Sequence, residues 1–419
     1  MIARRHASLA LVLPTIIVLA SCASSVPTGG TSPAATVDRA AATAPFVPAV
    51  VSELVAAVSQ QNAVAFEAPA SVVDGGVSQS SDSDGLVISL ASANKPVKGD
   101  SFAKRLKKKA KSAYDAQDAY LGDLQEALAG DDLQVESVSV AVDSYAIDKK
   151  SGALTTKLHI SRDLSSGVTW EEVIPYVTTI DSSTGEVSSL VVQDDSWRNA
   201  ASSGSTQDVQ DEPAVIPNDG SQLGEVPDES SAEQAGSDGT LQVESGLFTE
   251  DEATASTVAL NSTQRAKIVT YAKKWWNKRN PAYTSVNVDC TNFVSQAMYA
   301  GGWTEVTGLY NSDTAWWHNG PDWPIPKSYA WASATSFYNF ARTHSARVTR
   351  YSSVYDLRTG DLLQYDIGAT GKDHSMVVTS TATGGPYLTY HTTDTLNKPF
   401  STIAVGLQSQ TPVWYALKV

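Results

Sequence analysis

Residues 289–302 have the sequence DCTNFVSQAMYAGG, and this stretch decides how the second half of the chain is interpreted. An apolar stripe at helical spacing is made of Phe293, Val294, Ala297 and Met298. Asp289 is a favourable N-cap residue, and the glycine pair 301–302 is a typical helix end. The pattern therefore predicts a helix that begins at Cys290 and packs its apolar stripe into a core.

Cys290 lies in the first turn of this predicted helix, where unpaired backbone amides and the helix dipole favour negative charge. Such a position favours the thiolate, which is the reactive form of cysteine. A free cysteine can also be a plain buried apolar residue. Asp289 before it and Thr291 after it favour the reactive interpretation, and we expect a nucleophile here.

A thiolate nucleophile needs a base that shares its proton and a third group that orients the base. Two strand-like runs, 374–379 and 387–392, are separated by a turn signal at Thr-Gly-Gly. If they form a hairpin, His374 at the start of one run lies close to His391 at the end of the other. We expect His374 to be the base and His391 the orienting group, with Asp394 as the competing orienting group.

Several motifs of this half carry a family resemblance, and they comprise residues 280–283 (NPAY), 289–296, 300–302 (AGG), 360–361 (GD), 373–375 (DHS) and 390–394 (YHTTD). Together they resemble the bacterial putative amidase domain family, over residues 262–419. That family is similar to the papain-like cysteine hydrolases, which include the CHAP and NlpC cell-wall types. The resemblance implies a papain-like domain, with a nucleophile helix packed on an antiparallel sheet.

The resemblance also implies the roles of single residues. Cys290 is then the nucleophile and His374 the general base and acid. Papain-like families use His, Asn, Asp or Glu as the third member, so His391 is expected, with Asp394 or Asp289 as a further third or supporting member. The Cys290 amide would stabilise the oxyanion, helped by Tyr283 unless that tyrosine only packs.

The Trp-rich stretch 316–331 allows two interpretations. Its aromatic side chains could wall a cleft and stack on sugar rings or peptide, or they could supply only a local core. The sequence favours neither.

Residues 46–197 predict a smaller α+β module of unknown function. A helix is expected over 104–128, and strand-like runs follow at 133–147, 153–160, 168–180 and 187–193. One helix against a curved antiparallel sheet is the simplest packing for that order. No catalytic constellation is visible in it, and its one histidine, His159, is expected to be structural.

Two segments have the composition of disordered linkers. Residues 22–45 predict a flexible stalk, and residues 198–261 an extended acidic linker. Between 199 and 261 there are 13 Asp and Glu and no Lys or Arg, whereas 262–419 holds 14 basic and 9 acidic residues, a charge of +5.

The amino terminus predicts export and lipid anchoring. Residues 1–21 have a basic start and an apolar run that is too short to span a bilayer comfortably. Cys22 directly after Leu-Ala-Ser resembles the lipobox of bacterial lipoproteins, in which this cysteine is acylated. We expect residues 1–21 to be a lipoprotein signal peptide and the protein to be extracytoplasmic, held on the bacterial cell membrane by acylated Cys22.

Composition narrows the classes of partner and of site that the sequence allows. With 45 acidic and 30 basic residues the formal charge is −15, so nucleic acid is not an expected partner. Two cysteines exclude a disulfide scaffold and a Cys-rich zinc site, and no HExxH or CxxC motif indicates a metal. We expect no metal and no cofactor.

The sequence therefore predicts a monomeric, lipid-anchored cysteine amidase or peptidase. Its expected substrate is an amide bond, plausibly in peptidoglycan peptides, and the same thiol could serve a transferase. The alternative is a catalytically degenerate module that binds cell wall or a partner protein.

Overall fold

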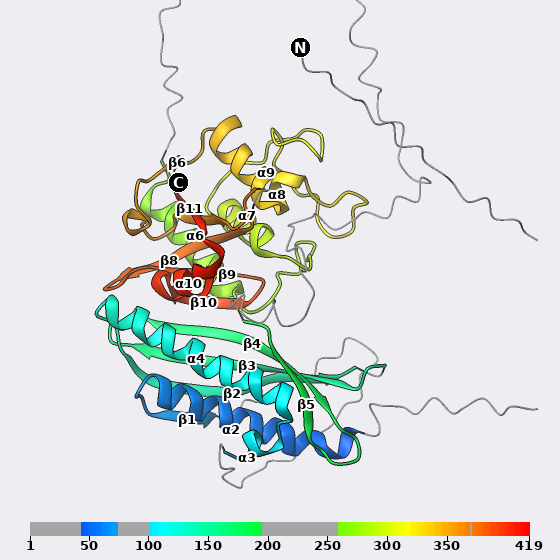
Figure 1. Ribbon diagram of the computed structural model, residues 1–419. Helices are drawn as coiled ribbons and strands as arrows, with labels where there is room; N and C mark the ends of the chain where they lie inside the picture. The colour runs from blue at the N-terminus through cyan, green and yellow to red at the C-terminus, as the bar shows by residue number, and fades with distance from the viewer. Residues whose placement is uncertain (1–42, 74–99, 149, 195–258, 369–370) are drawn as a thin grey trace, which may run out of the picture. The chain divides into compact units, whose positions relative to one another are not determined.

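The structure is a computed structural model that describes residues 43–73, 100–148, 150–194, 259–368 and 371–419 (Figure 1). All of these belong to one compact unit, residues 38–419. The predicted signal peptide 1–21 with Cys22, the stalk except for 43–45, and the acidic linker except for 259–261 lie outside the described residues. Among the residues described, no helix is long and apolar enough to cross a membrane.

The first described region, residues 43–194, contains two long helices and five strands (Figure 1). Its elements are η1 (Ala44–Phe46), α2 (Val47–Ala65), β1 (Ala70–Val73), α3 (Asp100–Arg105), α4 (Lys108–Gly130), β2 (Val135–Ile147), β3 (Ala153–Leu164), β4 (Thr169–Ile180) and β5 (Val187–Val192). The strands alternate buried and more exposed side chains, because one sheet face is covered by α2 and α4.

The second described region begins with helices and ends with strands. Its elements are α6 (Ser262–Trp275), α7 (Cys290–Ala300), α8 (Tyr329–Ala332), α9 (Ala334–Tyr338), η3 (Asn339–His344), β6 (Thr349–Arg350), η4 (Val354–Asp356), β7 (Leu362–Asp366), β8 (His374–Ala382), β9 (Gly385–Tyr390), β10 (Asp394–Pro399), α10 (Phe400–Leu407), η5 (Gln408–Gln410) and β11 (Val413–Lys418). A capping box of Asn261 and Gln264 starts α6.

The described strands of both regions form one sheet, in the order β1-β2-β3-β4-β10-β9-β8-β7-β11-β6, with β5 also on β4. Except for the parallel pair β1 and β2, neighbouring strands run antiparallel. The architecture is therefore a mixed α/β fold with a large, antiparallel-rich sheet.

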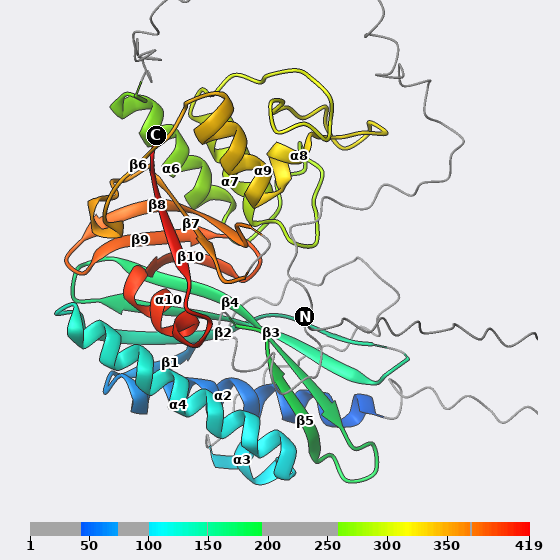
Figure 2. The same cartoon turned by 45° about the horizontal axis from the view of Figure 1, so that its top comes forward.

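Strands β7, β8 and β9 are buried on both faces. On one face Leu362 and Val377 pack with α6, α7 and the aromatic residues around α8 and α9. On the other face the alternate residues Leu363 and Met376 pack with α10, which Figure 2 shows beside β10. The helix α7 is thus fixed against the sheet by a dedicated core, and this positions its first residue, Cys290.

A buried ion network accompanies the pairing of β4 with β10, in which Glu172 is the register partner of Thr395. Glu172 accepts from Arg162 at 2.7 Å and from Lys398 at 2.8 Å, and all three side chains are at most 3% exposed. A carboxylate buried in this way is stable only with such partners. The burial of Glu172 in the first region therefore depends on Lys398 in the second region.

Most expected elements are present. The strand-like runs of the first region correspond to β2–β5, and the two expected strands of the second region form the hairpin β8–β9. The helix expected over 104–128 begins at Lys108, because Lys107 has an extended backbone. The expected single helix against the sheet is wrong, since α2 packs there beside α4.

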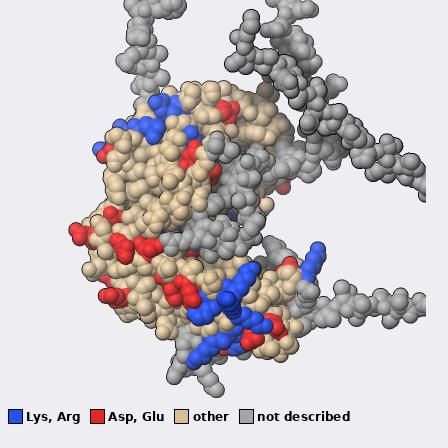
Figure 3. All heavy atoms as spheres, in the orientation of Figure 1, with Lys and Arg blue, Asp and Glu red and all other residues tan. Residues whose placement is uncertain are grey.

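Exposed lysines gather where α3 meets α4 (Figure 3). They are Lys104, Lys107, Lys108, Lys109 and Lys111. Lys107 pairs with Asp181 and Glu186, and Lys111 pairs with Asp115. This basic patch is therefore partly neutralised by carboxylates of its own region.

Removing the charge of Glu172 tests the ion network. Glu172→Gln leaves Arg162 and Lys398 without their counterion, so we expect a loss of about 3–5 kcal/mol in the free energy of unfolding by urea. The matched control is Glu171→Gln on the same strand, where the side chain is 25% exposed and lies 3.8 Å from His159. We expect less than about 1 kcal/mol there. Equal effects of the two variants would contradict the structural role of Glu172.

Candidate active site

Cys290 is the first residue of α7 and has no exposed surface. Its Sγ lies 3.7 Å from the hydroxyl oxygen of Thr291. Thr291 Oγ1 and Ser375 Oγ are 2.9 Å apart, and Gln364 Nε2 donates to the same Ser375 oxygen at 2.8 Å. The residue after the cysteine is therefore hydrogen-bonded to the residue after His374.

His374 is the first residue of β8 and is 6% exposed. Its ring lies between two tyrosines, with centroid distances of 5.3 Å to Tyr365 and 5.0 Å to Tyr390. Tyr365 is also its register partner on β7. An imidazole held between two rings has few orientations open to it.

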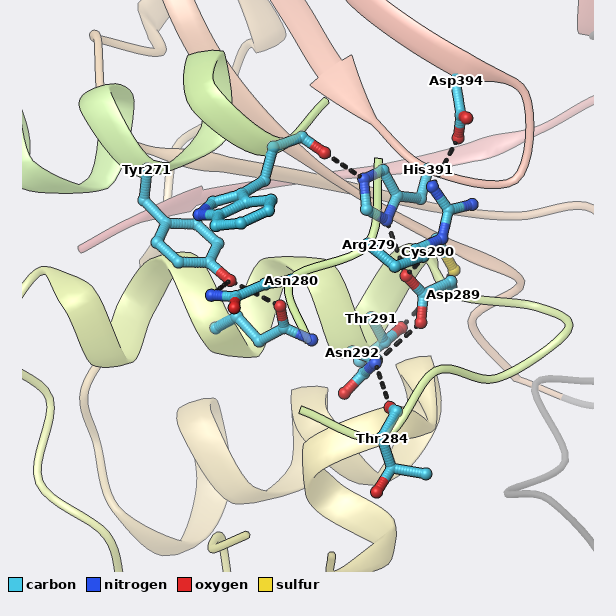
Figure 4. A network of polar contacts seen from close by, with 12 residues as sticks. Tyr271, Arg279, Asn280, Thr284, Asp289, Cys290, Thr291, Asn292, His391 and Asp394 are labelled. Carbon is cyan, nitrogen blue, oxygen red and sulfur yellow. Dashed lines mark hydrogen bonds and ion pairs between the residues drawn. The ribbon is translucent and has the colours of Figure 1, made fainter. Parts of the chain in front are cut away.

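Asp289, directly before the cysteine, is the centre of a polar network (Figure 4). Its Oδ2 lies 2.6 Å from His391 Nδ1 and 3.0 Å from Arg279 Nε. Its Oδ1 accepts from Asn292 Nδ2 at 2.7 Å. With a side chain that is 1% exposed, this carboxylate exchanges water for contacts with a guanidinium, an imidazole and an amide.

The prediction that Asp289 caps the helix needs a correction. Asp289 occupies the N-cap position, but its side chain makes no capping hydrogen bond to the backbone. The physical reason is competition, because Arg279 and His391 offer a charged partner and a second strong donor to the same carboxylate. The Asp289 side chain therefore joins the start of α7 to other elements instead of capping the backbone of that helix.

His391 and Asp394 make their contacts with groups other than His374. Beyond Asp289, His391 Nε2 lies 2.8 Å from the carbonyl oxygen of Trp275, which accepts the hydrogen bond. Asp394 accepts from Arg279 Nη1 at 2.8 Å.

Strand alternation explains the direction of His391. Tyr390 faces the ring of His374, and the next side chain along the strand points to the opposite side. There His391 stacks on Phe293 of α7 at a centroid distance of 4.1 Å. His391 contacts Asp289, and Arg279 joins Asp289 to Asp394.

Tyr283 packs among rings. It lies 4.5 Å from His318 and 6.0 Å from Trp331, measured between centroids. Burial, with smaller effects of Tyr299 and Glu305, raises the pKa of Tyr283 to about 12. The phenol therefore keeps its proton at neutral pH and remains a potential donor.

Of the Trp-rich stretch 316–331, two indoles belong to the core. Trp316 and Trp331 are fully buried, whereas Trp323 is 61% exposed. Trp331 Nε1 donates to Asn292 Oδ1 at 2.9 Å, and Asn292 in turn holds Asp289. The core interpretation is confirmed for these two, and Trp331 also supports the network beside the cysteine.

Sequence reasoning missed Arg279, Asn292 and Lys327 as neighbours of Asp289. A signal existed for Asn292, which stands three residues after Asp289 on the same helix face. Arg279 and Lys327 come from separate loops, and no spacing links them to the cysteine.

Comparison with known proteins agrees with the site's location. Residues 262–414 match the family described as "Putative amidase domain". The match indicates amide hydrolysis, a hydrolase activity, for this part of the chain. No solved structure gives a significant match.

Two curated proteins of Bacillus subtilis (strain 168) are similar to parts of the chain. "Uncharacterized protein YhbB" is 38% identical over 117 residues, which is 27% of this chain and 36% of that protein. "Uncharacterized protein YjcM" is 33% identical over 140 residues, 31% of each chain. The chain thus spans about a third of the length of these relatives.

Neutralising Asp289 tests the network. Asp289→Asn keeps the side-chain shape but leaves Arg279 and His391 without a buried carboxylate, so we expect a loss of about 3–5 kcal/mol in the free energy of unfolding. Asp394→Asn is the control, because Asp394 is 18% exposed and contacts only the far end of Arg279. It should cost less than about 1 kcal/mol, and a larger cost than that of Asp289→Asn would refute the central place of Asp289.

Proposed function

We propose that residues 262–419 form a cysteine amidase in which Cys290 is the nucleophile and His374 the general base and acid. The Cys290 sulfur attacks the carbonyl carbon of the amide, and its proton passes to His374. The carbon–nitrogen bond then breaks, and the amine leaves with that proton. Water, deprotonated by His374, attacks the thioester, and the product acid leaves as the thiol forms again.

The observation that carries this proposal is the hydrogen bond between Thr291 and Ser375. It ties the start of α7 to the start of β8, one residue beyond Cys290 on the first element and one beyond His374 on the second. Both hydroxyl-bearing residues are buried, so the tie is protected from water. It brings the backbones of Cys290 and His374 close together, which supports a shared site for these two residues.

The charge on Asp289 also bears on the proposal. An unpaired carboxylate next to Cys290 would oppose a negative sulfur. Arg279 offsets that charge at 3.0 Å, and the amino-terminal end of α7 adds a favourable dipole. These two effects therefore favour a thiolate even though an acidic residue precedes the cysteine.

The finer assignment extends this proposal. A nucleophile helix on an antiparallel sheet supports a papain-like domain. The lipobox-like Cys22 supports an extracytoplasmic, membrane-anchored enzyme, and peptidoglycan peptides are then the amide substrate within its reach. The charge of +5 over 262–419 favours anionic wall polymers as the surroundings in which it works.

A second candidate has one observation in its favour. Cys290 has no exposed surface, so neighbouring groups must move before a substrate can reach it. A module that binds wall material or a partner protein without turnover needs no such movement. The two candidates differ in whether the thiol reacts.

Substitution of the proposed pair tests catalysis. With purified cell-wall sacculi and the full-length protein, Cys290→Ala should lower fragment release, resolved by mass spectrometry, about 10³-fold or more. His374→Gln should lower it about 10²- to 10⁴-fold. His344→Gln, at an exposed position, is the control and should keep full activity. Wild-type release equal to that of Cys290→Ala would favour the binding module.

Replacement of Cys22 tests anchoring. Without the acylated thiol the protein loses its lipid, so Cys22→Ala should move it from the membrane fraction to the soluble or secreted fraction. Immunoblots of fractionated cells measure this shift, and Cys290→Ala is the control that keeps the membrane location. An unchanged location of Cys22→Ala would argue against lipid anchoring.

A further inference from the structure

Lys327 is a buried cation near the proposed nucleophile. The residue is only 7% exposed, and no hydrogen bond, salt bridge or ring contact of its ammonium group is found among the residues that the structure describes. Its Nζ is not one of the fully buried polar atoms that lack a partner, so the ammonium keeps some contact with solvent. Lysine is almost never buried this far without a partner. A lysine whose stem is buried and whose ammonium reaches solvent can take an anion from solution as its counterion.

The backbone around Lys327 fixes its direction. Lys327 forms an antiparallel bridge with His318, and residues paired in this way point their side chains to the same face. His318 packs against Tyr283 at 4.5 Å and Trp331 at 4.6 Å. The lysine therefore lies on the face that Tyr283 and Trp331 line.

This face leads to the cysteine. Trp331 bonds to Asn292, and Asn292 bonds to Asp289, the neighbour of Cys290. Lys327 is also close enough to Asp289 for the two charges to interact. The unpartnered ammonium thus lies on the side of the molecule where the proposed chemistry occurs.

The acidic neighbours of Lys327 balance its charge only in part, since Asp289 has other partners and Glu305 lies 4.0 Å from His318. Asp289 already contacts Arg279 and His391. Burial lowers the pKa of His318, against a smaller raising effect of Glu305, and so favours the neutral imidazole. Burial also lowers the pKa of Lys327, against a smaller raising effect of Asp289.

We infer that Lys327 binds a carboxylate of the substrate, so that the enzyme prefers amides with a free carboxylate close to the bond that is cleaved. The inference rests on the proposed function, since it names the substrate class of the same site. An ammonium–carboxylate contact in a water-poor site is directional and selective. A neutral amide or ester in the same place leaves the lysine unpaired.

Alkylation of Cys290 tests the inference without any turnover. Iodoacetate and iodoacetamide react with a thiolate in the same way, and iodide leaves. Iodoacetate carries a carboxylate where iodoacetamide carries a neutral amide. In the full-length protein at pH 7, the ratio of the two rates at the Cys290 peptide, measured by mass spectrometry, should fall about 10-fold or more in Lys327→Met. Lys327→Arg should keep most of the ratio.

The control for the lost charge is Lys418→Met, at an exposed position on β11, which should leave the ratio unchanged. A ratio that is equal in wild type and Lys327→Met would overturn the inference. If Lys327→Met alone is unfolded, as judged by circular dichroism, Lys327→Gln takes its place with the same expectation.

A binding experiment separates this inference from the proposed chemistry. In full-length Cys290→Ala, calorimetric titration with acetyl-dialanine should show binding that weakens about 10-fold or more when the peptide's carboxylate is amidated or when Lys327 is also changed to Met. Binding that ignores both changes would overturn the inference, whatever the thiol does. If Cys290 resists both alkylating reagents while this binding depends on Lys327, the cysteine chemistry fails and the carboxylate site stands.

Discussion

A carboxylate that has left water must find its charge partners inside the protein, and the second half of this chain is arranged around one such group, Asp289. Arg279 comes from the loop after α6, His391 from the turn after β9 and Asn292 from α7. The three contacts join a helix start, a loop and a strand end at one point. The cysteine next to Asp289 is held in place by them.

Local sequence patterns predicted the helices and strands that depend on residues close together in the chain. The helix at Cys290 follows from one apolar stripe, and the hairpin β8–β9 follows from two apolar runs around a turn. The contact of Glu172 with Lys398 spans 226 residues, and no local pattern encodes it. The helix α2 was missed because its β-branched residues favour helix only weakly and because packing decides its state.

For the site, the sequence proposed the cysteine and both histidines but could not give the direction of their side chains. Side chains alternate along a strand, so His391, directly after Tyr390, points away from the side of the sheet that Tyr390 faces. The hairpin pattern in the sequence predicts only how far along the strand each histidine lies. Lys327 stands alone among prolines in the Trp-rich stretch. Its burial, at 7% exposure, is a result of the folded packing, which composition alone cannot show.

The pairing of β4 with β10 has a practical consequence for anyone who dissects the protein. A fragment that starts at residue 262 would present β10 as an open edge, with unpaired amides and carbonyls and with Lys398 deprived of Glu172. Open edges of this kind recruit other chains, so such a fragment would tend to self-associate. Expression of the intact chain avoids that hazard, because β4 of the first region then pairs with β10.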